Sequence, residues 1–235
     1  MIRFFTAVSL ALFPLSVLAN ERISQKFEIE GTRLIYDTEK INGEITERDI
    51  GALKRALRKH TEILEIQLNS SGGSVHAGTE MAGVVMKYRL DTYVGDECTS
   101  ACVDVFLAGN RRHIAQGAKI GFHQRSWGAE AVQRYYRNWR ERKNWDSPFE
   151  FGAWIYADTQ IEIHEHLAYM ISRGVEAGFA VESMKAESSE IWYPTQEELA
   201  TAGVLREAVL PPLERPRVVA EPLSDRPQVV LQQKK

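Results

Sequence analysis

The sequence predicts an α/β fold with a mostly parallel sheet. Through the first half of the chain, short apolar runs of strand length alternate with longer segments of helical period, in the order strand, helix, strand, helix, strand. This order is typical of βαβ units, whose strands run parallel. Two predicted strands lead into runs of small residues, at 69–74 and 95–100. Because functional turns gather at the carboxyl ends of parallel strands, we expect the functional site at these two turns.

The N-terminal elements follow from alternation and capping. Residues 24–45 alternate in polarity in places, which predicts one or two strands, and Asn42 with Gly43 is a turn signal. Thr46 is a suitable N-cap for a helix that reaches about His60, because apolar residues recur at helical spacing on one face of this segment.

The next elements surround the two turns. The pattern predicts a buried strand at 63–68, a helix at 75–88, a strand at 91–94, a helix-like run at 101–107 and a hairpin-like pair at 112–115 and 119–123. Further elements are a long helix at 160–173, a short helix capped by Thr195, and a final strand or core tail at 204–209.

Residues 124–157 interrupt this order with a segment rich in aromatic residues and arginine. One interpretation is a helical excursion that packs on its own domain. The other is a lid or a subunit contact, because aromatic residues and arginine are enriched in the cores of contacts. Both interpretations stay open at this point, and we expect a homo-oligomer.

The two ends of the chain differ in composition from the rest. Residues 1–19 hold one charge, Arg3, and an apolar run with a small-x-small cleavage site after Ala19, which predicts a secretory signal peptide and a periplasmic or secreted protein. An uncleaved anchor is the alternative, although the run is short for a membrane span. The proline-rich residues 211–235 predict a disordered tail, so we expect the folded domain within 20–210.

The charge of the chain argues against a nucleic-acid partner. Lys and Arg together number 29 and Asp and Glu number 32. The predicted cleavage removes Arg3 and none of the acidic residues. A slightly acidic chain without a wide basic field gives no general basis for binding nucleic acid.

Cys98 and Cys102 are the only cysteines of the chain, and they flank Ser100. Two cysteines of an exported protein usually pair, but a separation of four residues requires a particular local geometry. The two interpretations are a disulfide that stiffens the turn and two small apolar residues packed beneath it. Two thiols are too few for a zinc site, and His164 and His166 point to different faces of their helix, so no metal is expected.

Three groups at the turns have the chemistry of acyl transfer. Ser100 lies between a strand and a helix-like run, where the N–H groups of a helix N-terminus favour a developing negative charge. His123 closes the next strand-like run, and the glycine turn at 69–74 follows a strand. A nucleophile, a base and a backbone donor are the parts of an acyl-transfer site.

These segments resemble the proteolytic subunit of the Clp protease, a family of the crotonase-like superfamily. The resemblance is carried by the glycine loop LNSSGGSV at 68–75, by Ser100 with Leu-Ala-Gly at 107–109, by Gly-Phe-His-Gln at 121–124, and by the segment at 195–205. It spans about residues 33–210 and implies a crotonase-like spiral of ββα units with a mostly parallel sheet.

The resemblance also implies a serine endopeptidase. Ser100 would attack the peptide carbonyl, and His123 would take its proton and pass it to the leaving amine. The backbone N–H groups of Gly73 and Ala101 would hold the oxyanion. No cofactor is implied. Because an exported protein meets no ATP, we expect peptides or unfolded proteins as substrates and no ATPase partner.

The third catalytic residue is less specific in the sequence. Counting back from Gly203 without gaps places the family's aspartate at Glu187, and Glu190 is close enough to serve after a small shift. The alternative is that both are solvated loop acids. Asp104, in the apolar run after Ser100, is expected to make a structural hydrogen bond, because a buried carboxylate needs a partner.

Two other functions remain open from the sequence. A catalytically inactive chain with the same fold would serve as a binding or assembly module, which the uncertain third acid and the aromatic segment favour. Crotonase-type acyl-thioester chemistry shares the oxyanion geometry, but it generally places carboxylates at the centre and needs a coenzyme that is implausible outside the cytoplasm.

Overall fold

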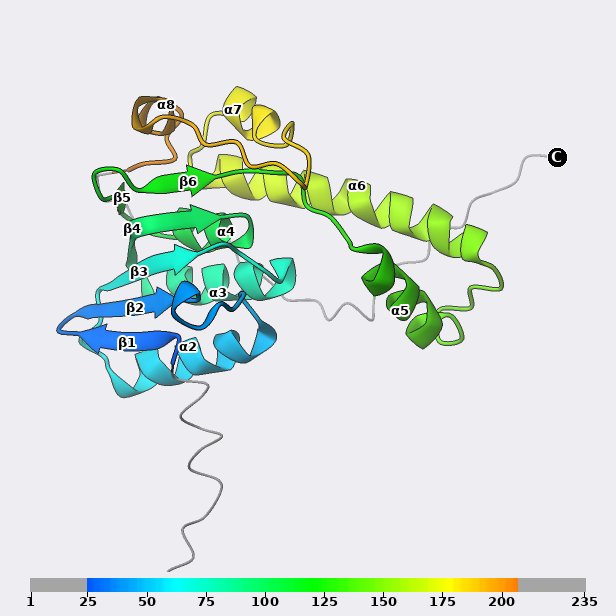
Figure 1. Ribbon diagram of the computed structural model, residues 1–235, viewed down its shortest axis with the longest axis horizontal. Coiled ribbons are helices and arrows are strands. Elements are labelled where there is room, and N and C mark those ends of the chain that lie inside the picture. The colour runs from blue at the N-terminus through cyan, green and yellow to red at the C-terminus, as the bar shows by residue number, and fades with distance from the viewer. Residues whose placement is uncertain (1–24, 207–235) are drawn as a thin grey trace, which may run out of the picture.

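A six-stranded sheet forms the centre of the molecule in a computed structural model that describes residues 25–206 (Figure 1). The strands pair in the order β1-β2-β3-β4-β5, and β6 also pairs with β4. Their bounds are β1 (Phe27–Glu30), β2 (Arg33–Asp37), β3 (Glu65–Ser70), β4 (Asp91–Thr99), β5 (Arg112–Ile114) and β6 (Lys119–Gly121). Among these strands the β1–β2 pair is antiparallel, and the other pairs are parallel.

The fold class expected from the sequence is therefore confirmed: the chain is α/β with a mostly parallel sheet, and its alternation of strands and helices agrees with a crotonase-like arrangement. The predicted signal peptide, residues 1–19, and the predicted tail, residues 211–235, lie outside the described residues and stay predictions.

Helices α2 (Glu47–Lys59), α3 (Val75–Tyr88) and α4 (Ala101–Leu107) follow one another along the sheet, each in contact with the next. In Figure 1 they lie behind and below the strands. The remaining helices are α5 (Ala129–Trp139), α6 (Pro148–Ser172), α7 (Ala177–Glu182), α8 (Gln196–Thr201) and the short 3-10 helix η1 (Glu39–Ile41). Within residues 25–206, none of the helices combines the length and hydrophobicity needed to span a membrane.

Local sequence explains where the first helices begin. The Thr46 and Asp49 side chains form a reciprocal capping box at the start of α2, as the N-cap prediction required. At the start of α3, the Ser74 hydroxyl accepts a hydrogen bond from the Ala77 N–H at 3.2 Å. These caps fix the point at which the chain leaves the preceding loop, and for α3 that loop is the glycine turn.

The core lies between the sheet and the helix layer. Burial alternates along β3, where Ile66 and Leu68 are fully buried and their neighbours are half exposed. This period of two places one face of the strand against α3 and α4, where Met81 and Phe106 are also fully buried. The parallel strands therefore share one apolar face, and their carboxyl ends reach the same edge of the sheet.

The hairpin expected at residues 112–123 is wrong. Strands β5 and β6 do not pair with each other; both run parallel to β4, β5 beside residues 92–94 and β6 beside residues 97–99. Strand β4 is longer than the apolar run at 91–94 suggested, so it offers two successive pairing sites to one following segment. Tertiary pairing has here replaced the local turn that the spacing suggested.

Residues 124–157 form helical structure, as one interpretation expected, but their aromatic side chains pack on one another and not on the core beside the sheet. We call residues 127–156 the arm. Tyr135 stacks on Trp154 with ring centroids 5.7 Å apart, and Trp145 and Phe151 are 4.9 Å apart and buried. In Figure 1, α5 and the first turns of α6 stand away from the sheet. The arm thus has a small apolar core of its own.

Arg112 joins the C-terminal end of α4 to the last described segment of the chain. The side chain is fully buried, and its guanidinium donates to the carbonyl oxygens of Val204 at 2.7 Å, Gly203 at 2.7 Å, Leu107 at 3.2 Å and Arg173 at 3.1 Å. Five rigid donors allow one arginine to satisfy several carbonyls that strands and helices leave unpaired. This clamp fixes the C-terminal part of the domain to the helix that carries Ser100.

Replacing Arg112 by Met should lower the free energy of unfolding by about 3 kcal/mol or more, because charge-assisted hydrogen bonds are lost and buried carbonyls are left without donors. Arg111→Met is the matched control, since the Arg111 side chain is exposed and makes no side-chain hydrogen bond within residues 25–206. Urea unfolding measures both. Equal midpoints for the two variants would contradict the clamp.

Candidate active site

Ser100 has a backbone conformation that residues other than glycine rarely adopt. It is the N-cap of α4, with φ of 56° and ψ of −129°. Such strain, of the order of 1–3 kcal/mol, persists only where the surroundings enforce it. The sharp strand-to-helix turn is the arrangement of a nucleophile elbow, which lifts a serine hydroxyl away from the backbone. The Ser100 N–H donates to the Gly121 carbonyl at 3.1 Å, so β6 holds the turn from one side.

The glycine turn holds the same residue from the other side. Gly72 has φ of +101°, and a Cβ at this position would lie 2.7 Å from the Ser100 Cβ, 2.9 Å from the Thr99 carbonyl oxygen and 3.2 Å from the Ala101 nitrogen. Those distances leave no space for a side chain, so the two backbones approach as closely as only glycine allows. The turn after β3 therefore packs directly against the turn after β4.

A buried polar network fixes the glycine turn. The Ser70 hydroxyl, fully buried, accepts hydrogen bonds from the Thr38 hydroxyl at 2.8 Å and from the Gly72 N–H at 3.1 Å. Next to it, Ile45 pairs with Gly73 in a parallel bridge through Ile45 N to Gly72 O and Ser74 N to Ile45 O. The bridge is formed by the Gly72 carbonyl and the Ser74 N–H, so the N–H of Gly73 takes no part in it.

Two backbone donors therefore remain beside Ser100. The N–H groups of Gly73 and Ala101 have no hydrogen-bond partner among residues 25–206. Ala101 is the first residue of α4, whose initial N–H groups have no partner within the helix. Gly73 directly follows Gly72, which packs against the Ser100 turn, and Ala101 directly follows Ser100. The role of these two N–H groups as oxyanion donors stays a prediction.

His123 follows β6 and lines the same pocket as Ser100. The flanking residues are held by backbone pairs, Phe122 with Trp192 and the Gln124 N–H with the Ala186 carbonyl at 2.9 Å. The His123 Nδ1 lies 2.7 Å from the Gln124 carbonyl oxygen. Because a carbonyl only accepts, Nδ1 carries the proton, and Nε2 presents a lone pair in the neutral ring. Within the described residues, no hydrogen bond joins the Ser100 hydroxyl to this ring.

The structure does not bring a carboxylate to His123. Glu187 and Glu190 are exposed in the turn after α7, where the Glu190 N–H donates to the Glu187 carbonyl at 2.9 Å. Neither side chain makes a hydrogen bond or ion pair within residues 25–206. The assignment of one of them as third catalytic residue stays a prediction.

Asp104 makes a structural contact, as its burial required. It is one turn into α4 and almost fully buried, and its Oδ2 accepts from Arg125 Nη2 at 2.7 Å. Its backbone carbonyl accepts from the Tyr169 hydroxyl at 2.7 Å, and burial raises the pKa of Tyr169. His166 Nδ1 lies 3.4 Å from Asp104 Oδ1 and 2.8 Å from Arg125 Nη2. These contacts tie α4 to α6 beside the pocket.

Sequence reasoning missed His166 and Arg125 as residues of this pocket, which Ser100, Asp104 and His123 also line. In the sequence, the position of His166 two residues after His164 bears only on metal binding. Among residues 25–206, no three His, Cys, Asp or Glu side chains are placed to hold a metal ion. One signal was available: Arg125 lies two residues after His123, and its cationic side chain was a natural partner for the buried Asp104.

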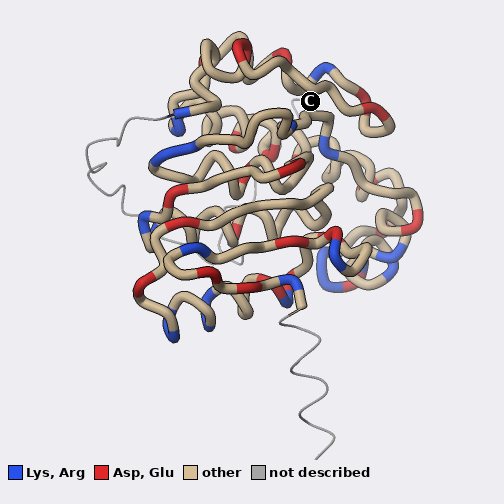
Figure 2. Tube along the Cα trace, turned by 60° about the vertical axis from the view of Figure 1, so that its left-hand side comes forward, with Lys and Arg blue, Asp and Glu red and all other residues tan. Residues whose placement is uncertain are grey.

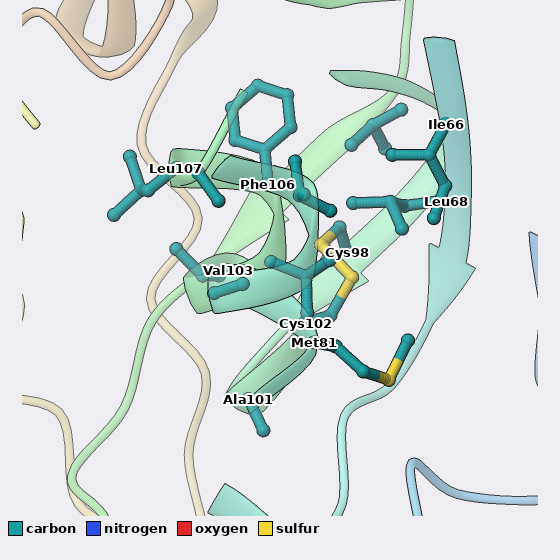
Figure 3. Packing of buried hydrophobic residues seen from close by; sticks show 14 of the residues in the cluster. Ile66, Leu68, Met81, Cys98, Ala101, Cys102, Val103, Phe106 and Leu107 are labelled. Carbon is teal, nitrogen blue, oxygen red and sulfur yellow. A yellow bond between two sulfur atoms is a disulfide. The ribbon is translucent and has the colours of Figure 1, made fainter. Parts of the chain in front are cut away.

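A disulfide joins Cys98 in β4 to Cys102 in α4, with their Cα atoms 5.3 Å apart. Of the two interpretations of these cysteines, the structure contains the bond, and both residues are also buried in the core. Figure 3 shows the two sulfur atoms beneath the start of α4, among Ile66, Leu68 and Met81. The bond links the residue two before Ser100 to the residue two after it, so it limits how far the turn can open.

Charged residues of both signs are interspersed along the chain (Figure 2). At the pocket, Asp104 and Glu162 face Arg125, whose Nη1 lies 3.3 Å from Glu162 Oε1. The pocket beside the serine therefore contains both signs of charge, with the cation held between two carboxylates.

Comparison with known proteins adds little to this geometry. No family model matches the sequence, and no curated protein matches it. Among solved structures, the chain is similar to a mutant of ClpP1 from Listeria monocytogenes, with a TM-score of 0.47 and 15% sequence identity, over 80% of this chain and 93% of that chain. Similarity at this level does not extend to activity.

Replacing Gly72 by Ala should lower the free energy of unfolding by about 1–3 kcal/mol, because the new Cβ meets the Ser100 turn at a positive φ. Gly83→Ala is the matched control. It lies in α3 with open space around the position of its Cβ, and alanine there should stabilise the helix by up to about 1 kcal/mol. Urea unfolding of both variants checks the sign. A Gly72→Ala protein as stable as the parent would show that the two turns are not in contact.

Replacing both Cys98 and Cys102 by Ala should lower the free energy of unfolding by about 2 kcal/mol, the loop-entropy value for so short a loop. Because both sulfur atoms are buried, the native disulfide should resist dithiothreitol that reduces it in urea. Alkylation followed by mass spectrometry counts the thiols in each condition. Two alkylated thiols in the protein unfolded in urea without reductant would show that the bond is absent.

Proposed function

We propose that this chain is an exported serine peptidase that hydrolyses peptides or unfolded proteins. The observation that supports this most is the conformation of Ser100: a serine in a strained turn at a helix N-terminus, in the pocket that His123 also lines. Strain at this position has no evident structural purpose, since a glycine would relieve it. Export rests on the composition of residues 1–19.

In this mechanism the Ser100 hydroxyl attacks the peptide carbonyl and passes its proton to His123. The Nε2 atom of His123 is suited to this role, because the Gln124 carbonyl holds the ring proton on Nδ1. In a catalytic triad an aspartate fixes the same tautomer. This step requires a side-chain motion that brings the hydroxyl and the ring into contact, and hydrogen bonds of this kind are often long before substrate binds.

The tetrahedral oxyanion would be held by the N–H groups of Gly73 and Ala101, each typically worth about 3 kcal/mol of transition-state stabilisation. His123 would then give its proton to the leaving amine, and water would release the acyl group by the same route. No cofactor takes part. Glu187 or Glu190 would complete the site if the loop after α7 moves toward His123.

A second candidate function is a catalytically inactive binding or assembly module. The missing hydrogen bond between Ser100 and His123 favours it, and so does the arm, where Phe149 is 87% and Tyr156 71% exposed. Exposed aromatic residues of this size are typical of contact surfaces. We propose that the arm contacts a second copy of the chain in either case.

Incubation with a fluorophosphonate probe should label wild-type protein at Ser100, and Ser100→Ala should remove the label. His123→Gln should slow labelling by about 100-fold or more, because general-base assistance is lost. His113→Gln is the matched control, since His113 lies on β5 and pairs with Glu65. Labelling is read by peptide mass spectrometry.

Two further variants identify the third residue. If Glu187→Gln or Glu190→Gln loses labelling, the affected residue is the predicted acid. If both variants are labelled as fast as wild-type protein, the Gln124 carbonyl alone orients His123. A folded wild-type protein that stays unlabelled would contradict the peptidase and leave the binding module.

A further inference from the structure

A second histidine, His166 of α6, lines the pocket beside Ser100. Its side chain is 12% exposed, and its neighbour Asp104 is 4% exposed. The pocket also has apolar walls, from Val103 and Phe122. Apolar walls with a few converging polar groups are the usual composition of a ligand site.

The contacts of His166 determine which ring nitrogen carries the proton. Arg125 Nη2 lies 2.8 Å from His166 Nδ1. A guanidinium only donates, so Nδ1 accepts, and in the neutral ring the proton is on Nε2. Asp104 Oδ1 lies 3.4 Å from the same Nδ1, and no hydrogen bond joins the two atoms.

Arg125 is itself fixed by two carboxylates. Its Nη2 donates to Asp104 Oδ2 at 2.7 Å and its Nη1 to Glu162 Oε1 at 3.3 Å. Asp104 lies on α4, whose first residue follows Ser100, and Glu162 and His166 are four residues apart on α6. The guanidinium is therefore held in one orientation, and the tautomer of His166 is set by a rigid group rather than by a mobile one.

The two histidines of the pocket consequently have opposite tautomers. His123 donates through Nδ1 to the Gln124 carbonyl and keeps a lone pair on Nε2, whereas His166 accepts at Nδ1 and keeps a proton on Nε2. One ring is suited to accept a proton and the other to donate a hydrogen bond. A salt bridge between α4 and α6 needs neither the histidine nor its position on the pocket, because Arg125 already pairs with Asp104 and Glu162.

We propose that His166 is a specificity-determining residue: its Nε2–H donates a hydrogen bond to an oxygen acceptor on the substrate side chain that enters the pocket beside Ser100. Arg125 and Asp104 are positioning residues that hold the donor tautomer. This inference rests on the proposed peptidase function and names its substrate class, peptides with a small oxygen-bearing side chain before the cleaved bond. Asparagine should be favoured over leucine, which has almost the same shape but no acceptor.

The experiment compares two fluorogenic peptides, acetyl-Ala-Ala-Asn-aminomethylcoumarin and its leucine counterpart, by kcat/KM. Wild-type protein should cleave the asparagine peptide about 10- to 100-fold faster, the range for leaving a buried donor unpaired. His166→Phe should abolish or reverse the preference. His166→Gln, which keeps an N–H donor, should retain part of it and shows that the loss is not misfolding.

Binding separates this inference from the peptidase proposal. Fluorescence anisotropy of Ser100→Ala with labelled forms of the two peptides needs no catalysis. Preference for the asparagine peptide in Ser100→Ala, lost in Ser100→Ala/His166→Phe, supports the donor role even if wild-type protein cleaves neither peptide. Cleavage of both peptides at equal rates overturns the donor role and leaves the peptidase standing. Neither cleavage nor selective binding would overturn both.

The tautomer has an independent readout. Nitrogen NMR of isotopically labelled histidine should show His166 protonated on Nε2 in wild-type protein. In Arg125→Met the nearest partner of Nδ1 is Asp104 Oδ1, so the proton should move to Nδ1. Arg134→Met, on the arm, is the matched control and should change nothing. A proton on Nδ1 of His166 in wild-type protein would overturn the assignment.

Discussion

The close approach of two turns is the constraint on which the rest of the site depends. Gly72 and Ser100 both have positive φ, and the gap between their backbones is too small for a side chain on the glycine. Each turn alone is a local feature after a strand. Held together, they place the Gly72 backbone directly against Ser100 and the Ala101 nitrogen. The strained conformation of Ser100 persists because Gly121, Gly72 and the disulfide leave it no relaxed alternative.

The close approach of the two turns follows from the order of strands in the sheet. Strands β3 and β4 are parallel neighbours, so their following turns meet at one edge. Their register shifts between Leu68 and Ser70, just before the glycine turn. The shift lets Ser70 pair beside Cys98 while its hydroxyl supports Gly72. Strand β6 pairs with the last residues of β4 and brings His123 to the same edge. The ends of β3, β4 and β6 thus carry the glycine turn, Ser100 and His123.

Local pattern was enough to predict most of this arrangement. The bounds of α3 and α4 and the roles proposed for Ser100 and His123 follow from short-range signals: caps, apolar period and turns of small residues. The failures are long-range. The hairpin at 112–123 was wrong because β4 pairs with both segments, and nothing within those residues reveals a partner twenty positions earlier. His166 lies 41 residues from Arg125, and only the packing of α6 against α4 brings the two together.

The tautomers of the two histidines also differ in whether a local or a long-range contact determines them. An imidazole has no fixed role until a partner selects which nitrogen carries the proton. For His123 that partner is the carbonyl of the adjacent residue, so its tautomer depends on a short segment of chain. For His166 the partner is a guanidinium fixed by carboxylates from two helices, so its tautomer depends on the assembled fold. The same side-chain type therefore presents an acceptor at one position of the pocket and a donor at the other, because one histidine contacts a backbone carbonyl and the other a guanidinium.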